Sequence, residues 1–395
     1  MAPPLLSIGF RPFFLAASWF AVLVMMVWLS FLITGAPSPG PWNPILWHGH
    51  ELLFGFTAAV IAGFLLTAAQ NWTKRQTCTP RSLTGLVILW LAARLGFLLP
   101  GIMPMWLLTA LDLAFFPLLA LLLAQALIPA ENRRNYAFIP LLLAFTVLNG
   151  MIHADLHGVA PGLGSTAMDL ATWLITVLLV FMGGRIIPFF TANRLPGLGV
   201  RQWPWLNWAS TLSTLAILPV YLVTGRDPWL AMVLGAASAF TLIRLLAWQP
   251  WGAVREPLLW ILHASYLFIP LGLGLQAASL VGVAGTWSAG VHLLMIGAMG
   301  GLCLGMMARV ALGHSGRPLV APWPIIVGFA AILLAAAARL FVALGVGPAW
   351  LMGASGLLWM VAFALYALVY TPILLKPRAN NTATPTGKPA MTVRT

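Results

Sequence analysis

The sequence predicts an all-α integral membrane protein, built as a single bundle of about twelve transmembrane helices. Of its 395 residues, 61% are hydrophobic and only 7% are charged, and the mean hydropathy is +0.96. A water-soluble domain needs a far larger polar surface than this composition supplies. The composition therefore excludes the soluble enzymes and soluble binding modules.

About twelve apolar segments approach the roughly 20 residues that a bilayer crossing requires, and prolines and tryptophans mark many of their starts. In chain order they are Phe13–Gly35, His48–Ala69, Ser82–Leu99, Pro104–Ile128, Asn135–Ala154, Ala167–Phe190, Trp205–Thr224, Pro228–Trp248, Glu256–Leu280, Trp287–Val310, Pro322–Leu344 and Pro348–Leu375. The first segment is too long for a cleavable signal peptide, so we interpret it as a retained span. We expect residues 1–375 to form one polytopic domain and residues 376–395, rich in Thr and Pro, to be a disordered cytoplasmic tail.

The basic residues set the orientation. The formal net charge is +13, yet these residues lie in the loops between apolar segments, which favours a positive-inside bias over nucleic-acid binding. If the spans alternate, the loops on one side carry Lys74, Arg75, Arg81, Arg133, Arg134, Arg194, Arg201, Arg255, Arg317, Lys376 and Arg378. The opposite loops carry Arg226 and little else. We therefore predict that both termini are cytoplasmic, N-in and C-in, and expect no nucleic-acid partner. Cys78 and Cys303, one in a loop and one in a span, indicate no disulfide framework.

A short sequence similarity between the two halves of the chain raises the possibility of a 6+6 pseudo-repeat. GFRPFF at Gly9–Phe14 opens the first span, and GGRIIPFF at Gly183–Phe190 closes the sixth. Both lie on the cytoplasmic side in the predicted topology. The match is short, so chance recurrence is the competing explanation.

The tenth span has two distinct faces on a helical wheel. Gly297, Gly301 and Gly305 form a small-residue stripe that lets another helix approach closely. The opposite face carries the imidazole, thioether and thiol groups that soft or borderline metals prefer, namely His292, Met299, Cys303 and Met306, with Met295 at its edge and Val310 beyond them. The simpler interpretation of the methionines is core packing.

Histidines at the outer ends of two spans are the candidate metal ligands. His48, His50 and Glu51 begin the second span, and His48 and His50 point to roughly opposite sides of a regular helix. The two histidines could bind one metal if the helix starts between them, or they could belong to two different metal centres. His292 lies at a similar depth, about 8 Å inside the tenth span, and three imidazoles at one depth would suit copper or zinc. Interfacial capping, and a core histidine bonded to a carbonyl, are the simpler alternatives.

A haem is the second candidate cofactor. His263 in the ninth span and His314 after the tenth lie at the cytoplasmic level, and two helices can present imidazoles to the two faces of a haem. Arginines at this level could bind haem propionates bidentately, namely Arg11, Arg185, Arg309 and Arg317. Taken singly, each arginine is better explained by the positive-inside bias. Arg185 stands out because Gly183 and Gly184 leave room beside it and Pro188 is expected to interrupt the helix.

Two acidic residues are candidate proton carriers. Asp112 lies about 8 residues inside the fourth span, and an intramembrane carboxyl is a functional candidate because it is costly to bury. Glu51 is the second candidate. His153, Asp155 and His157 have ligand-like spacing, but they precede a Gly/Pro-rich loop, so we expect a solvated helix end.

Five segments together resemble the NnrS family, whose members are described as haem- and copper-containing inner-membrane proteins of the bacterial nitric oxide response, often alongside denitrification. The segments are GFRPFF (Gly9–Phe14), WHGHELLFGF (Trp47–Phe56), GFLLTAAQNWT (Gly63–Thr73), GGRIIPFFTAN (Gly183–Asn193) and MMARVALGHSGRPL (Met306–Leu319). The resemblance implies a location in the bacterial inner membrane and metal binding by His48, His50, His263, His292 and His314. It does not say which histidines bind which metal. Depth alone leads us to expect copper through His48, His50 and His292, and haem through His263 and His314.

Two classes of function remain open at this point. The resemblance implies a haem and copper protein that binds nitric oxide or a nitrosylated metal species in nitrosative stress, and it leaves open whether the protein reduces nitric oxide to nitrous oxide as an oxidoreductase. No CxxCH motif or docking domain is present, so an external electron donor, as yet unidentified, would be required. The alternative is a secondary transporter, or a haem or copper delivery factor without redox turnover. Most ionisable groups lie near span ends, which argues against a carrier.

Overall fold

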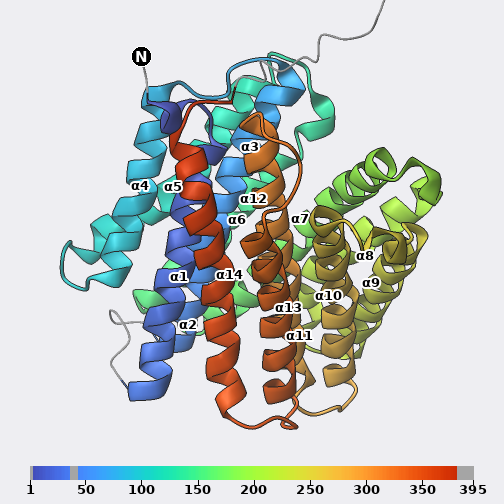
Figure 1. The fold of residues 1–395 in the computed structure, drawn as a ribbon. Helices are drawn as coiled ribbons and strands as arrows, with labels where there is room; N and C mark the ends of the chain where they lie inside the picture. Colours follow the sequence, from blue (N-terminus) through green and yellow to red (C-terminus); the bar gives the residue numbers. More distant parts are fainter. Residues whose placement is uncertain (1–2, 36–42, 380–395) are drawn as a thin grey trace, which may run out of the picture.

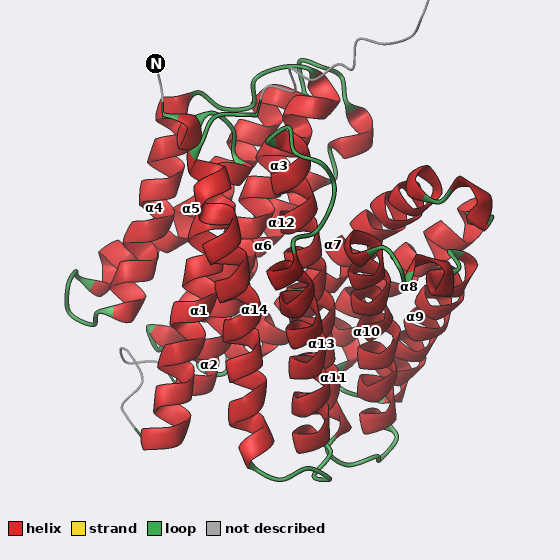
Figure 2. Ribbon diagram, viewed as in Figure 1, coloured by secondary structure: helices red, strands yellow, loops and turns green. Residues whose placement is uncertain are grey.

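The computed structural model describes residues 3–35 and 43–379. Within these ranges the regular structure is helical, and twelve helical segments are long and apolar enough to cross a membrane (Figures 1 and 2). The predicted fold class is confirmed. Residues 380–395, most of the predicted disordered tail, lie outside the described residues, so the disorder of the tail stays a prediction.

The spans run in chain order as follows. They are α1 (Phe10–Thr34), α2 with α3 (Pro44–His50 and Ala58–Thr73), α4 (Pro80–Leu98), α5 (Met105–Leu127), α6 (Phe138–Leu156), α7 (Leu163–Arg194), α8 (Pro204–Thr224), α9 (Pro228–Ala247), α10 (Pro257–Leu280), α11 with α12 (Thr286–His292 and Gly301–His314), α13 (Trp323–Ala343) and α14 (Trp350–Leu375). Prolines occupy the first turn of many of them, where a missing N–H costs nothing.

Both described ends of the chain lie at the same end of the bundle, at the top of Figure 1. Arg11, buried near the start of α1, donates from Nη1 to the carbonyls of Leu374 and Lys376, at 2.8 and 2.5 Å. The basic loops lie at this same end, which agrees with the predicted N-in and C-in orientation. Here Arg11 joins the first span to the last.

The second, sixth and tenth spans form the centre of the bundle, because a larger share of each is buried than in any other candidate span. Peripheral helices such as α8 are buried on one side only. The segments that carry most of the recognised motifs are therefore those that the protein interior surrounds.

The glycine stripe of the tenth span contacts α10, as predicted. A Cβ at Gly301 would overlap Oγ of Ser265, and one at Gly297 would overlap the Phe268 ring. A larger residue at either position would push these side chains away, so glycine permits α10 to pack this closely against the tenth span.

Two central spans contain wide, π-helical turns immediately after the candidate histidines. One covers Glu51–Thr57, between α2 and α3, and the other covers Leu293–Gly300, between α11 and α12. Such turns are rare and occur frequently at functional sites. They fall in the second and tenth spans, which a 6+6 repeat would not pair; the repeat itself remains untested.

The sixth span differs from its prediction. α7 continues through Pro188 to Arg194 without interruption. The space beside Gly183 and Gly184 is filled by Tyr266 and Arg244 rather than left for Arg185. Arg244 is itself buried and donates to the carbonyl of Val180 at 2.8 Å and to the Tyr266 hydroxyl. Arg244 therefore ties α7 to α9 and α10 just before the proline.

Candidate functional site

A large cavity lies at the end of the bundle opposite the termini, and we call it the outer cavity. Its volume is about 730 Å³, and its lining includes His48, His292, Met295 and Met299. Apolar side chains such as Trp359 form much of the remaining wall. The structure thus brings two of the three expected outer imidazoles to one space, from spans far apart in sequence.

The start of α2 positions His48. Pro44 occupies the first turn, and the Asn43 side chain accepts a hydrogen bond from the backbone N–H of Ile45 at 2.9 Å, so the helix begins before both histidines. The imidazole of His48 stacks on Trp28, with ring centroids 4.2 Å apart. Its Nδ1 is buried and has no hydrogen-bond partner among the described residues. A buried nitrogen without a partner is costly, so this atom is a candidate ligand atom.

His292 is oriented by its own helix. Nδ1 lies 2.7 Å from the backbone carbonyl of Ser288, which can only accept a hydrogen bond, so Nδ1 carries the proton. In a neutral ring, Nε2 then keeps its lone pair. Met295 and Met299 line the same cavity, one and two turns further along the span. These side chains offer one imidazole nitrogen and two thioether sulfurs, the donor atoms that soft metals prefer.

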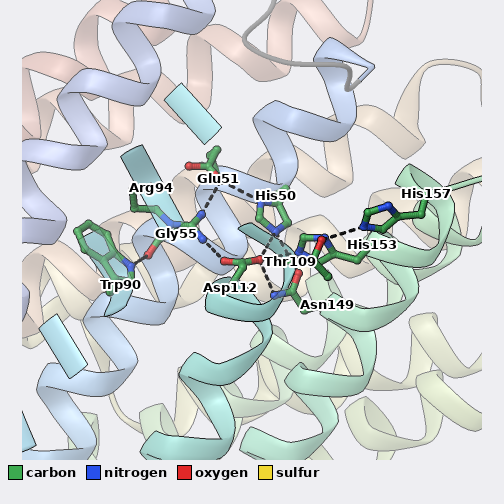
Figure 3. Close-up of polar contacts among 10 residues, drawn as sticks. All are labelled: His50, Glu51, Gly55, Trp90, Arg94, Thr109, Asp112, Asn149, His153 and His157. Atoms are coloured by element: carbon green, nitrogen blue, oxygen red, sulfur yellow. Dashed lines mark hydrogen bonds and ion pairs between the residues drawn. The ribbon is translucent and has the colours of Figure 1, made fainter. Parts of the chain in front are cut away.

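His50 faces away from the outer cavity and joins a buried polar network (Figure 3). Its Nδ1 lies 2.9 Å from Oε1 of Glu51. Its Nε2 lies 3.1 Å from Oδ2 of Asp112 and 3.0 Å from Oδ1 of Asn149. The three imidazoles expected at one copper site are thus divided between two environments, because the helix directs positions 48 and 50 to different sides.

Arg94 of α4 neutralises this network. One guanidinium nitrogen donates to Oε1 of Glu51 at 2.5 Å, and the other donates to Oδ1 of Asp112. All three side chains are at most 3% exposed. The two proton-carrier candidates are therefore held in ion pairs beneath the outer end of the bundle, and neither lines the outer cavity.

His153 of α6 completes the network, contrary to the solvated helix end that we expected. It is 2% exposed, and its Nε2 lies 3.0 Å from Oδ2 of Asp112. Its Nδ1 lies 3.1 Å from the Thr109 hydroxyl, which in turn lies 2.9 Å from Nε2 of the exposed His157. The last turns of α6 pack against α5, and this contact buries His153 while His157 stays in solvent. One ligand atom each of His50, Asp112 and His153 lies within 4.8 Å of the others, close enough for one metal ion.

At the end of the bundle that holds both described ends of the chain, the structure separates the two expected haem histidines. His314 and Arg185 line a smaller cavity of about 320 Å³, the inner cavity. His263 is not among its lining residues; its Nε2 lies 2.9 Å from the Thr191 hydroxyl, while its Nδ1 is buried and bonds to no residue that the structure describes. The haem assignment of this pair stays a prediction.

The remaining arginines proposed for haem propionates make other contacts. Arg309 lies over the Phe190 ring at 3.9 Å, and Arg317 contacts the Ser315 carbonyl at 3.5 Å. Arg185 donates to Oδ1 of Asn135 at 2.9 Å. Only Arg185 of the four expected arginines also lines the inner cavity, which it shares with Arg134.

Sequence reasoning missed Arg94 and Asn149 and set His153 aside. Arg94 lies well inside the third predicted span, and an intramembrane arginine is by itself a signal for a buried partner. Asn149 carries no comparable signal, because a single amide in an apolar helix is compatible with many positions.

A family model described as NnrS protein matches residues 4–378, nearly the whole chain. No curated protein matches the sequence significantly.

Proposed function

Since the chain belongs to the NnrS family, we propose that its part in the nitric oxide response is to bind nitric oxide at a haem- and copper-containing site in the bacterial inner membrane. Family membership makes this a membrane protein of that response. The location, the two metals and the ligand are our proposal.

The outer cavity carries the proposal. Its volume of about 730 Å³ lies well within the roughly 300–1,000 Å³ typical of ligand pockets, whereas the 320 Å³ inner cavity lies at the lower limit. A porphyrin is a large ligand, so the outer cavity suits it better. We therefore favour the outer cavity for haem, in place of the cytoplasmic level that depth alone led us to expect.

The chain's residues have distinct roles in this proposal. His48 would hold haem iron, since it lines the outer cavity and its buried Nδ1 has no partner among the described residues. His292, Met295 and Met299 would hold copper through Nε2 and the two thioethers. When bound, the two metals supply the affinity for nitric oxide and one-electron chemistry. The mostly apolar wall would admit a small uncharged gas.

Reduction of nitric oxide to nitrous oxide is the enzymatic form of this proposal. Two molecules of nitric oxide, two electrons and two protons would yield one nitrous oxide and one water. The electrons would come from an external donor such as a quinol, since the chain has no CxxCH haem motif. Release of nitrous oxide by the purified protein with a chemical reductant would establish turnover, and its absence would restrict the role to binding.

The first experiment is spectroscopic. Protein purified in detergent from haem-replete cells should contain iron and copper and show a Soret band that shifts when nitric oxide is added to the dithionite-reduced sample. A colourless, metal-free preparation would contradict the proposal and favour the secondary transporter.

Histidine variants then locate the cofactors. We expect His48→Ala to lose haem and His292→Ala to lose copper, while His263→Ala and His314→Ala keep both. The opposite pattern, with haem lost only from the His263 and His314 variants, would place the haem at the cytoplasmic level and overturn our choice of cavity.

A further inference from the structure

We propose that His50, Asp112, Asn149 and His153 bind a divalent first-row metal ion, at a site separate from the outer cavity and different from it in ligand chemistry. None of the four residues lines either cavity. They come from three spans, with His50 on α2, Asp112 on α5, and Asn149 and His153 on α6. Their polar atoms point toward one another (Figure 3).

The surroundings of His50 call for a cation. Nδ1 faces a carboxylate oxygen of Glu51 at 2.9 Å, so Nδ1 carries a proton. Nε2 faces a carboxylate oxygen of Asp112 and the amide oxygen of Asn149, both acceptors, at 3.1 and 3.0 Å. The amide is not reversed, because its Nδ2 donates to Asp112 at 2.8 Å. A neutral ring would therefore point its Nε2 lone pair at two oxygens, which is unfavourable unless a positive charge lies between them.

The fixed charges leave room for a cation but do not by themselves select a metal ion over a proton. Glu51 and Asp112 bring two negative charges and Arg94 brings one positive charge, so the sum is one negative charge, and a divalent ion would change it to one positive charge. An uncompensated charge in a buried, low-dielectric site is very costly. A proton on His50 would balance the sum with a single imidazole. It would not explain why a second imidazole, His153, directs its Nε2 to the same carboxylate oxygen at 3.0 Å.

The outer contacts of both rings match those of metal-bound histidines. A histidine ligand usually donates its other ring N–H to a carboxylate, carbonyl or similar acceptor, which fixes the orientation of the ring. Here the Glu51 carboxylate lies at hydrogen-bond distance from Nδ1 of His50, and the Thr109 hydroxyl lies at hydrogen-bond distance from Nδ1 of His153. Arg94 holds Oδ1 of Asp112, so the oxygen that faces both imidazoles is Oδ2, which also accepts from Nδ2 of Asn149.

The donor set selects the class of ion. Two imidazole nitrogens, one carboxylate oxygen and one amide oxygen suit borderline divalent ions such as Zn²⁺, Fe²⁺ and Co²⁺, and they lack the thiolate or thioether that favours Cu⁺. Four protein donors that line neither the outer nor the inner cavity make a closed site, which is typical of structural metal ions. The ion would fasten α2, α5 and α6 together beside the outer cavity.

The test uses Co²⁺ alone as the probe. Protein purified in detergent and treated with a chelator is titrated with Co²⁺, and the visible d–d absorption is recorded. We expect the wild type to bind one Co²⁺ tightly, with band intensities typical of tetrahedral coordination. His153→Gln should weaken binding at least tenfold, and Glu51→Gln by about 10–100-fold, the usual effect of losing an outer partner. His157→Gln, which changes the exposed neighbouring imidazole, is the matched control and should bind like the wild type.

Two results would overturn the proposal: no tight Co²⁺ binding by the wild type, or the same affinity in wild type and His153→Gln. If that variant does not fold, the wild type still decides, because Zn²⁺ or Co²⁺ must raise its Tm after chelation. Haem content and the Soret shift with nitric oxide are recorded in the same samples. A colourless protein that binds Co²⁺ would refute the proposed function alone, and a normal Soret shift without Co²⁺ binding would refute this inference alone.

Discussion

The Thr57 hydroxyl lies 3.3 Å from the sulfur of Met299, which joins the wide turns of two spans that are 242 positions apart in sequence. The same hydroxyl lies 2.8 Å from the carbonyl of Leu52, five residues back, as expected where the helix widens. Met299 also lines the outer cavity. This contact therefore sets the register of the second span against the tenth, and with it the positions of His48 and His292.

Met299→Leu tests the thioether as a copper donor. Leucine has a similar volume, so we expect a stability loss below about 1.5 kcal/mol. Copper content should fall while haem is retained, because only the sulfur is removed. Metal analysis of the purified variant measures this. Met307→Leu, equally buried in the same span but outside the cavity lining, is the control. Equal copper loss in both variants would argue against a specific role of Met299.

Gly301→Ala tests the close contact between α12 and α10. The added methyl group would overlap Ser265, so we expect a loss of about 1–3 kcal/mol, measured by thermal unfolding in detergent. Gly313→Ala changes the same helix where the nearest side-chain atom is 3.7 Å away, and it should unfold like the wild type or slightly later. A Gly301 variant as stable as the Gly313 variant would mean that the helices separate without cost.

Arg94→Gln tests the buried ion pairs. Removal of one partner leaves Glu51 and Asp112 uncompensated, which for a buried pair costs about 3–5 kcal/mol. Thermal unfolding or the yield of folded protein measures the loss. Arg194→Gln is the matched control, since Arg194 pairs with Glu256 at 3.0 Å but is 58% exposed, and exposed pairs contribute about 1 kcal/mol or less. Similar small losses in both variants would show that the network does not depend on Arg94.

Cys78 provides a pH-dependent test outside the membrane. Burial raises the pKa of its thiol from 9.0 to about 11. The folded thiol is therefore almost entirely protonated at neutral pH, and maleimide labelling in a Cys303→Ala background should be slow at pH 8 and accelerate until about pH 11. Because the folded pKa is the higher one, the thiol's stabilising contribution is complete below pH 9 and is lost as pH rises from 9 to 11. Labelling that reaches its maximal rate at pH 9 would contradict this environment.

The candidate site was predictable only in part. His48 and His292 could be assigned to one depth, and the opposite directions of His48 and His50 follow from helical geometry. The inclusion of His153 could not be predicted, since its local sequence, with a Gly/Pro-rich loop a few residues later, is typical of a solvent-facing helix end. Only the packing of α6 against α5 buries it, and that contact leaves no local signal.

The sequence alone determined the number of spans and the glycine-lined face of the tenth span, and it predicts their orientation. A bilayer imposes length, hydropathy and charge rules on each segment separately, so these features can be read locally. The tertiary structure alone decided that Glu51, Asp112 and Arg94 meet, that Arg244 fills the space beside Gly184, and that His263 and His314 occupy different sites. A buried charge is stable only beside a partner, and the fold, rather than neighbouring sequence, supplies that partner.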